Sequence, residues 1–391
     1  MATPEAGFCR AVAVLEEPRD PPEQVALFES KTRLAKQGLN GRYRRRRRMT
    51  CRGAATFLPL ALACVCLVGC GRSGDARVGR AGVTWIANWT ARKHVRGVVD
   101  LSAPRQRGSI AIAAAGRLQL LLPDGKLRSF ARGYSAPRGL EPYIALSSGQ
   151  TVKAARCRFA ENNLYALRLS HGNGVTVIDT RGNVRRFASL PSRGLENGIT
   201  FDGTGRFGHR ILVTSTAKAK TTVYAIDCSG HVEVLTRDAP RVEGGIAVAP
   251  ATFGRFAGDL IAPDELSGKL YAIGPDGGAS LIAESGLAHG QDIGVESEGF
   301  VPAKFKDALV ADRRTRGTRH PGDDLVLGIS QATLAASGVQ PGALLAVTEA
   351  GAKTIAVTCT KSCRVRYIAE GPSLAHIEGH VVFEAANGAN D

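Results

Sequence analysis

The chain has 391 residues, 44% of them hydrophobic, and its 51 lysines and arginines against 35 aspartates and glutamates give a formal net charge of +16. This apolar fraction excludes a disordered chain, and a single continuous apolar stretch, near residue 60, excludes a protein that crosses a membrane several times. The first 70 residues hold 12 of the basic and 6 of the acidic residues, so the remainder carries about +10. These charges are scattered over strand-like segments without interleaved aromatic residues, and we therefore expect no nucleic-acid partner.

The first 69 residues are predicted to precede the mature protein. Residues 1–48 are rich in Pro, Glu and Arg without a structural period, and we expect them to be disordered or untranslated, with Met49 as the true start. Five arginines at 44–48 precede an uncharged stretch, 53–69, which is short for a membrane helix and contains a proline. Small polar residues and glycines follow, so 49–69 is predicted to be a cleaved signal peptide. An uncleaved signal anchor and a twin-arginine signal are the alternatives.

The end of this stretch, Leu67-Val-Gly-Cys70, resembles the lipobox of bacterial lipoproteins. The resemblance implies that Cys70 takes a diacylglycerol thioether, becomes the mature N-terminus and inserts into the lipid bilayer, with residues 70–91 as a tether. We therefore expect an extracytoplasmic protein of the cell envelope, anchored to the outer face of the cytoplasmic membrane or to the outer membrane.

Residues 92–386 repeat one unit with a period of about 47 residues. Alternating apolar residues around a turn with Asp or Gly predict an antiparallel hairpin in each unit. Two further strands precede each hairpin, for example 198–202 and 210–215. The four hairpins are expected at 118–130, 175–187, 223–235 and 270–282.

Four short strands in each unit predict an all-β protein, a β-propeller of six blades with four antiparallel strands each. The range is five to seven, because 299–362 fits one blade with an insertion at 313–341 or two irregular blades. A strand at 381–383 is expected to join a first blade begun by 95–112 and so close the ring, with 387–391 as a tail. A β-sandwich is the rival fold, but it lacks a turn motif repeated at constant spacing. The sequence has no Gly-rich phosphate loop, so we expect neither nucleotide nor flavin.

Four cysteines follow Cys70, an even number that agrees with export. The spacing of Cys359 and Cys363 predicts a local disulfide, with Cys157 and Cys228 as small buried residues or a second bridge. A zinc site would need a further Cys or His pair at ligand spacing, and the sequence offers none.

An acidic residue stands just before the first strand of successive units. Because the first strand of a blade is innermost, these side chains are expected to converge at one mouth of the central channel. Their repulsion requires raised pKa values, basic partners or a bound cation, and oxygen ligands favour Ca²⁺ or another divalent cation such as Mg²⁺. The alternative is structural, with the acids accepting hydrogen bonds from neighbouring blades. The candidates are Glu141, Glu196, Glu243, Asp292 and Glu378.

Two histidines accompany these acids. His289 precedes Asp292 and His376 precedes Glu378, each by two or three positions. An imidazole beside carboxylates can act as a general base or as a metal ligand. We therefore treat both histidines as candidate catalytic residues.

From about 95 to 385 the chain resembles the six-bladed propellers that include the SMP-30/gluconolactonase-like and NHL-repeat proteins. The resemblance lies in the Glu196-Asn-Gly-Ile and Glu243-Gly-Gly-Ile strand starts and in the repeated hairpins. SMP-30-like lactonases hold a divalent cation through Glu, Asn and Asp, and the nearest matches here are Glu141, Asn197 and Asp292. The pattern departs from the family where Tyr143 follows Pro142 without the glycine, and where the second Asn ligand is matched by Glu243 or by no residue.

Three functions follow as expectations. The first is a monomeric, lipid-anchored propeller that binds a small molecule, a sugar or a protein. The second, implied by the resemblance, is a metal-dependent lactonase or related hydrolase. The third is a lyase similar to streptogramin lyase, a propeller enzyme class that pairs a metal with a His base.

Overall fold

The computed structural model describes residues 86–137, 141–168 and 172–386. The predicted signal peptide, Cys70, most of the predicted tether and the C-terminal tail lie outside these residues. Within the described ranges, no helix is long and apolar enough to span a membrane.

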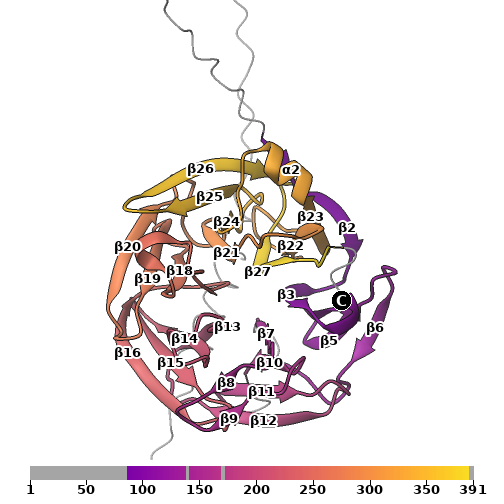
Figure 1. The fold of residues 1–391 in the computed structure, drawn as a ribbon. Coiled ribbons are helices and arrows are strands. Elements are labelled where there is room, and N and C mark those ends of the chain that lie inside the picture. The colour runs from indigo at the N-terminus through magenta and orange to yellow at the C-terminus, as the bar shows by residue number, and fades with distance from the viewer. Residues whose placement is uncertain (1–85, 138–140, 169–171, 387–391) are drawn as a thin grey trace, which may run out of the picture. The chain divides into compact units, whose positions relative to one another are not determined.

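Six antiparallel sheets are arranged radially around a central axis, as predicted (Figure 1). We number these blades I to VI in ring order and give their strands from the axis outward. Blade I has β3 (Val98–Pro104), β4 (Ile110–Ala114), β5 (Arg117–Leu121) and β6 (Leu127–Phe130); blade II has β7 (Ile144–Leu146), β10 (Leu164–Leu167), β11 (Gly174–Ile178) and β12 (Val184–Ser189). Blade III has β13 (Leu195–Phe201), β14 (Ile211–Ala217), β15 (Lys220–Ile226) and β16 (Val232–Pro240); blade IV has β17 (Ala247–Val248), β18 (Leu260–Asp264), β19 (Lys269–Ile273) and β20 (Ala279–Glu284). The four predicted hairpins form the two outer strands of these blades.

Blades V and VI are interleaved along the chain. The inner strand of blade V comes first in the chain and is followed by the two middle strands of blade VI. The helix α2 (Gln331–Ala336) then leads to the remaining strands of blade V. Blade V has β21 (Val295–Phe300), β24 (Leu344–Thr348), β25 (Thr354–Cys359) and β26 (Cys363–Glu370), with β1 (Ala87–Asn88) parallel at its outer edge; blade VI has β27 (Ile377–Phe383), β22 (Asp307–Asp312), β23 (Leu325–Ser330) and β2 (Thr90–His94). The region 299–362 therefore contributes strands to two blades, as the second predicted alternative held, but their interleaving was not predicted.

The ring closes at blade VI rather than at blade I. The C-terminal strand β27 pairs with β22, with Phe383 opposite Ala308, and it does not join the sheet of β3 and β4 as predicted. Near the N-terminus of the described chain, β2 pairs with β23 at the outer edge of the same blade, whereas β1 before it belongs to blade V. The strands β2 and β27, from near the two ends of the described chain, thus complete one sheet, which leaves β27 packed beside β3 without hydrogen-bonded pairing (Figure 1).

Packing between blades explains the burial pattern. Second strands such as β4, β18 and β24 are buried along their whole length, because neighbouring blades cover both of their faces. Outer strands such as β12 and β26 are largely exposed along their first halves and carry exposed arginines there. The core accordingly consists of apolar layers between the sheets.

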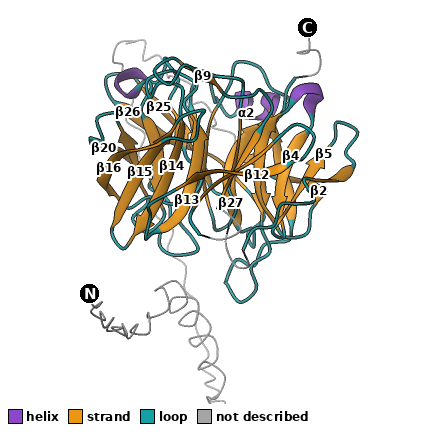
Figure 2. Ribbon diagram, turned by 90° about the horizontal axis from the view of Figure 1, so that it is seen from below, coloured by secondary structure: helices purple, strands orange, loops and turns teal. Residues whose placement is uncertain are grey.

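Within each blade the first strand begins, and the second strand ends, at the same face of the ring, which we call the mouth face. The helices η1 (Gln106–Gly108), η2 (Gly254–Phe256) and α2 lie together at the opposite face (Figure 2). A small hairpin of β8 (Thr151–Val152) and β9 (Cys157–Arg158) belongs to that opposite face as well.

Two disulfides are present among the described residues. The predicted Cys359–Cys363 bridge joins the ends of β25 and β26, and Cys157 and Cys228 form the second bridge that the sequence left open. Both follow strands that end at the face opposite the mouth, so neither is part of the carboxylate cluster described next.

Candidate functional site

The predicted carboxylates all stand at the mouth face. Glu196 and Glu378 are the second residues of β13 and β27 and are buried, whereas Glu141, Glu243 and Asp292 precede inner strands and are partly buried. The structure brings Glu141, Glu243 and Glu378 close enough that each charge affects the ionisation of a neighbour. Glu196 instead faces an arginine.

A second set of charged residues comes from the ends of the second strands, and sequence reasoning missed it. Arg168 follows β10, Glu265 follows β18, Arg313 follows β22 and Glu349 follows β24. The signal was present in the sequence, because each of these buried apolar strands runs directly into a charged residue. An antiparallel second strand must end where the first begins, so these side chains share the mouth with the predicted carboxylates.

Arg313 is the central cation of the mouth. Its Nη1 contacts the carboxylate of Glu141 and lies 3.0 Å from Oε1 of Glu378. Burial opposes the ionisation of Glu378, but Arg313 and hydrogen bonds from His376 and Tyr143 together lower its pKa to about 2. Glu378 is therefore a buried, fully ionised carboxylate at neutral pH.

A short proton-bearing chain leads to the same carboxylate. The hydroxyl of Tyr143 lies 2.7 Å from Oε1 of Glu296 and 2.9 Å from Oε2 of Glu378. Burial and the charge of Glu378 raise the pKa of Glu296 well above its usual value. Since a hydroxyl has one hydrogen, a protonated Glu296 donates to Tyr143, and Tyr143 donates to Glu378.

His376 completes a group of three potential metal ligands. Its Nε2 lies 2.8 Å from Oε1 of Glu349 and 3.4 Å from Oε1 of Glu378, and the three ligand atoms all lie within 4.8 Å of one another. Burial lowers the pKa of His376, but the two carboxylates outweigh it and raise the pKa to about 10. We call Glu349, His376 and Glu378 the mouth cluster.

The neighbourhood of the mouth cluster holds an excess of acids. Burial and the adjacent Glu349 raise the pKa of Glu265 to about 9, and burial and Glu265 raise that of Glu243 to about 7. Burial raises the pKa of Glu349 to about 7 despite its hydrogen bond with His376. Without a cation, several of these carboxyl groups hold protons near neutral pH.

Two predicted site residues lie apart from the mouth cluster. His289 is exposed, and its Nδ1 lies 3.2 Å from the carbonyl of Leu287 in its own loop. Asn197 donates from Nδ2 to the carbonyl of Val242 at 2.8 Å and accepts from the Thr214 hydroxyl at 3.1 Å. The amide of Asn197 therefore ties blade III to the loop that leads into blade IV.

Asp292 and Glu196 have separate surroundings. Asp292 has a left-handed backbone, with φ at 61°, and its amide donates to Glu265. Glu196 is fully buried, with Nη1 of Arg168 at 3.8 Å from its carboxylate. Burial raises the pKa of Glu196 to about 7 even though Arg168 opposes the shift. Neither carboxylate is part of the mouth cluster.

His380 lies two residues after Glu378 on β27, further from the mouth face. Its Nδ1 lies 3.0 Å from Oδ2 of Asp100 in blade I, and its Nε2 lies 2.9 Å from the carbonyl of Ile199 in blade III. Asp100 also accepts the amide of Ile144 at 2.7 Å. The predicted structural role of an acid that accepts amides from neighbouring blades thus belongs to Asp100, which the sequence analysis did not name.

The inner strands approach one another closely at this depth. A Cβ on Gly245 would lie 2.3 Å from the carbonyl oxygen of Gly379, two blades away. Glycine is therefore required at position 245, directly after the Glu243-Gly244 pair that the repeat displays. Gly379 and His380 follow Glu378 along β27, so these contacts lie further from the mouth face than the mouth cluster.

Glu298 in β21 is a buried carboxylate outside the mouth cluster. Its side chain is buried, and neither carboxylate oxygen has a hydrogen-bond partner among the described residues. Burial alone raises its pKa well above the usual value. The folded protein therefore retains a proton that the unfolded chain loses near pH 4.3, so the free energy of unfolding falls as pH rises, by up to about 1.4 kcal/mol per pH unit between the unfolded and folded pKa values.

We expect Glu298→Gln, which is neutral at every pH, to remove this contribution. The variant should be more stable than the parent above pH 6, by a margin that grows with pH, in urea unfolding at pH 5, 6, 7 and 8. Glu161→Gln, at an exposed position, is the matched control and should leave the slope unchanged. A stability difference that does not vary with pH would contradict the burial argument.

No protein-family model and no curated protein matches the sequence. Similar solved structures include a streptogramin B lyase, 12% identical with a TM-score of 0.43 over 72% of each chain. A calcium-binding protein, regucalcin, from Agrobacterium tumefaciens is 12% identical with a TM-score of 0.45, over 76% of this chain and 83% of that one. A gluconolactonase-like structure is 13% identical with a TM-score of 0.29, over 62% of this chain and 92% of that one. Similarity at this level assigns no residue a role, and the fold assignment rests on the six sheets themselves.

Proposed function

We propose that the chain is a divalent-cation-dependent hydrolase of a small ester or lactone, with the cation held by the mouth cluster. The observation that carries this proposal is the convergence of three ligand atoms within 4.8 Å from Glu349, His376 and Glu378. Three protein ligands leave coordination positions open, as metal sites of hydrolases require. A nitrogen ligand beside two carboxylates favours Mn²⁺ or Zn²⁺ over Ca²⁺, which prefers oxygen alone.

When bound, the cation supplies Lewis acidity toward a carbonyl oxygen and toward water. The surrounding residues supply proton transfer and orientation. Glu265, which shares a hydrogen bond with Glu349, is suited to donate a proton to the leaving alkoxide. Glu243, whose carboxylate pairs with Arg241, is suited to accept a proton from attacking water. Arg313 and Tyr143 hold Glu378 in position from two sides.

Metal binding tests this proposal. We expect the full-length protein to retain one equivalent of Mn²⁺ or Zn²⁺ after dialysis, measured by elemental analysis, and a chelator to lower its melting temperature by about 5–10 °C. His376→Gln and Glu349→Gln should each abolish retention and the shift. His289→Gln is the matched control and should preserve both.

If the protein retains metal, the next experiment is a hydrolysis assay. A loaded protein should hydrolyse members of a lactone and ester panel, and His376→Gln should lose that activity. Retention of metal without turnover would favour the first expectation from sequence, a propeller that binds its ligand without chemistry. Absence of metal, or retention unaffected by His376→Gln, would contradict the mouth cluster as a metal centre.

We also propose that this domain acts outside the cytoplasm on a lipid anchor at Cys70. Two disulfides support an oxidising compartment. Labelled palmitate should be incorporated into the full-length chain in a bacterial host and not into Cys70→Ser, which should leave the membrane fraction. Equal labelling or equal membrane association of the two chains would contradict the anchor.

A further inference from the structure

A cavity of about 570 Å³ opens at the mouth face beside blade I. Most other blades place a large charged side chain at the start of the first strand and at the end of the second, but blade I has Gly97 before β3 and Ala115 after β4. These small residues, with Val99 and Gly116, leave the space unfilled. Its volume is in the range of small-molecule sites.

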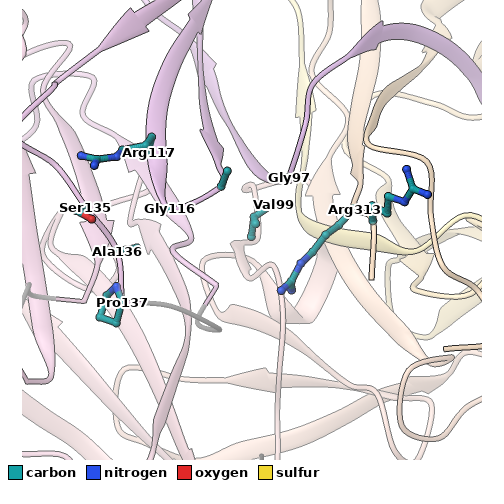
Figure 3. Close-up of a pocket in the computed structure, with 10 residues that line it drawn as sticks. Gly97, Val99, Gly116, Arg117, Ser135, Ala136, Pro137 and Arg313 are labelled. Carbon is teal, nitrogen blue, oxygen red and sulfur yellow. The ribbon is translucent and has the colours of Figure 1, made fainter. Parts of the chain in front are cut away.

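The charge of this cavity is opposite to that of the rest of the mouth. Three arginines line it, Arg117, Arg313 and Arg314, and no acidic residue is among the described residues that line it. Arg313 also contacts Glu141 and Glu378, so Arg117 and Arg314 supply the positive charge that these carboxylates do not compensate. Arg117 and Arg313 lie on opposite sides, with Gly97, Val99 and Gly116 between them (Figure 3). Nη1 of Arg117 donates to the carbonyl of Tyr134 at 3.0 Å, which fixes this guanidinium at the rim.

The cavity adjoins the mouth cluster through Arg313. Nη1 of Arg313 lies 3.0 Å from Oε1 of Glu378, and the same oxygen lies 3.4 Å from Nε2 of His376. A molecule seated in the cavity therefore lies beside the proposed metal centre. Guanidinium groups bind carboxylate and phosphate through paired hydrogen bonds, and partial burial strengthens that interaction.

We propose that this cavity binds an anionic oxygen group, a carboxylate or a phosphate, of the substrate. The identity of the substrate rests on the proposed function. If the protein is a hydrolase, its substrate is an anionic ester or lactone, with the charged group between the arginines and the carbonyl toward the mouth cluster. The cavity is in that case the specificity site of the enzyme.

The test uses succinate and inorganic phosphate as probes, titrated calorimetrically into the full-length protein with and without chelator. We expect millimolar binding that survives chelation and persists in His376→Gln, so that it is independent of the metal. Arg117→Ala/Arg314→Ala should weaken binding at least tenfold. Tighter binding of succinate would identify a carboxylate substrate, and tighter binding of phosphate a phosphorylated one.

The matched control is Arg185→Ala/Arg364→Ala, which removes two exposed arginines from the outer strands β12 and β26 and should change binding less than twofold. If both double variants weakened anion binding equally, the loss of net charge would explain the effect, and the inference would be overturned. Binding that disappears with chelator would place the anion on the cation and also overturn it. Neither result bears on metal retention, so failure here is distinguishable from failure of the metal centre.

Discussion

Replacing Arg313 by methionine is expected to lower the free energy of unfolding by about 3 kcal/mol at pH 7. The substitution keeps the aliphatic stem and removes the charge that faces Glu141 and Glu378. Glu378 retains 5% exposure of its side chain, so it is left as a nearly buried carboxylate with less compensation. Removing one partner of a buried pair costs about 3–5 kcal/mol, and the value belongs at the lower end because 21% of the Arg313 side chain is exposed.

Urea unfolding of the chelator-treated protein measures this loss. Arg314→Met, at the exposed neighbouring position, is the matched control and should change stability by less than about 0.5 kcal/mol. Adding Glu141→Gln to Arg313→Met should recover part of the loss, because one of the two uncompensated carboxylates is removed. A loss below about 1 kcal/mol for Arg313→Met would show that His376 and Tyr143 alone compensate Glu378.

The same variant connects stability with the proposed metal centre. Glu378 belongs both to the Arg313 ion pair and to the mouth cluster. A divalent cation at the mouth cluster would return positive charge to Glu378, so the deficit of Arg313→Met should shrink when Mn²⁺ or Zn²⁺ is added. The arginine and the proposed cation would therefore compensate the same carboxylate, that of Glu378.

The repeated hairpins were predictable because their signals are local. An Asp or Gly turn between alternating strands specifies the 223–235 hairpin without reference to the rest of the chain, and four such hairpins at constant spacing specify a propeller. The interleaving of blades V and VI was not predictable in this way. It depends on whether β24 pairs with β21 or with β23, and that choice is made by side-chain packing between segments far apart in sequence.

The site was half predictable for a related reason. Glu378 and His376 were found because the start of a first strand lies at the channel in every blade. Glu349 and Arg313 were missed although the topology places the end of each second strand at the same mouth. The separation of His289 from the mouth cluster depends on the conformation of an exposed loop, and no periodicity in the sequence encodes that conformation.

Removing the Cys157–Cys228 disulfide is expected to destabilise the protein by about 4 kcal/mol, roughly twice the cost of removing Cys359–Cys363. The first bridge joins residues 71 positions apart and the second joins residues 4 apart, so the first restricts the unfolded chain far more. It also links β9, in the hairpin inserted in blade II, to the end of β15 in blade III, whereas the second bridge joins adjacent strands of one blade.

The double variants Cys157→Ala/Cys228→Ala and Cys359→Ala/Cys363→Ala form a matched pair, because each removes two cysteines from the face opposite the mouth. Urea unfolding under oxidising conditions should separate them by about 2 kcal/mol. Both variants should retain metal as the parent does, since neither bridge is part of the mouth cluster. Equal losses of stability would mean that the Cys157–Cys228 bridge does not restrict the unfolded chain more than the shorter bridge does. Loss of metal in the first variant alone would mean that the contact between blades II and III supports the mouth from the opposite face.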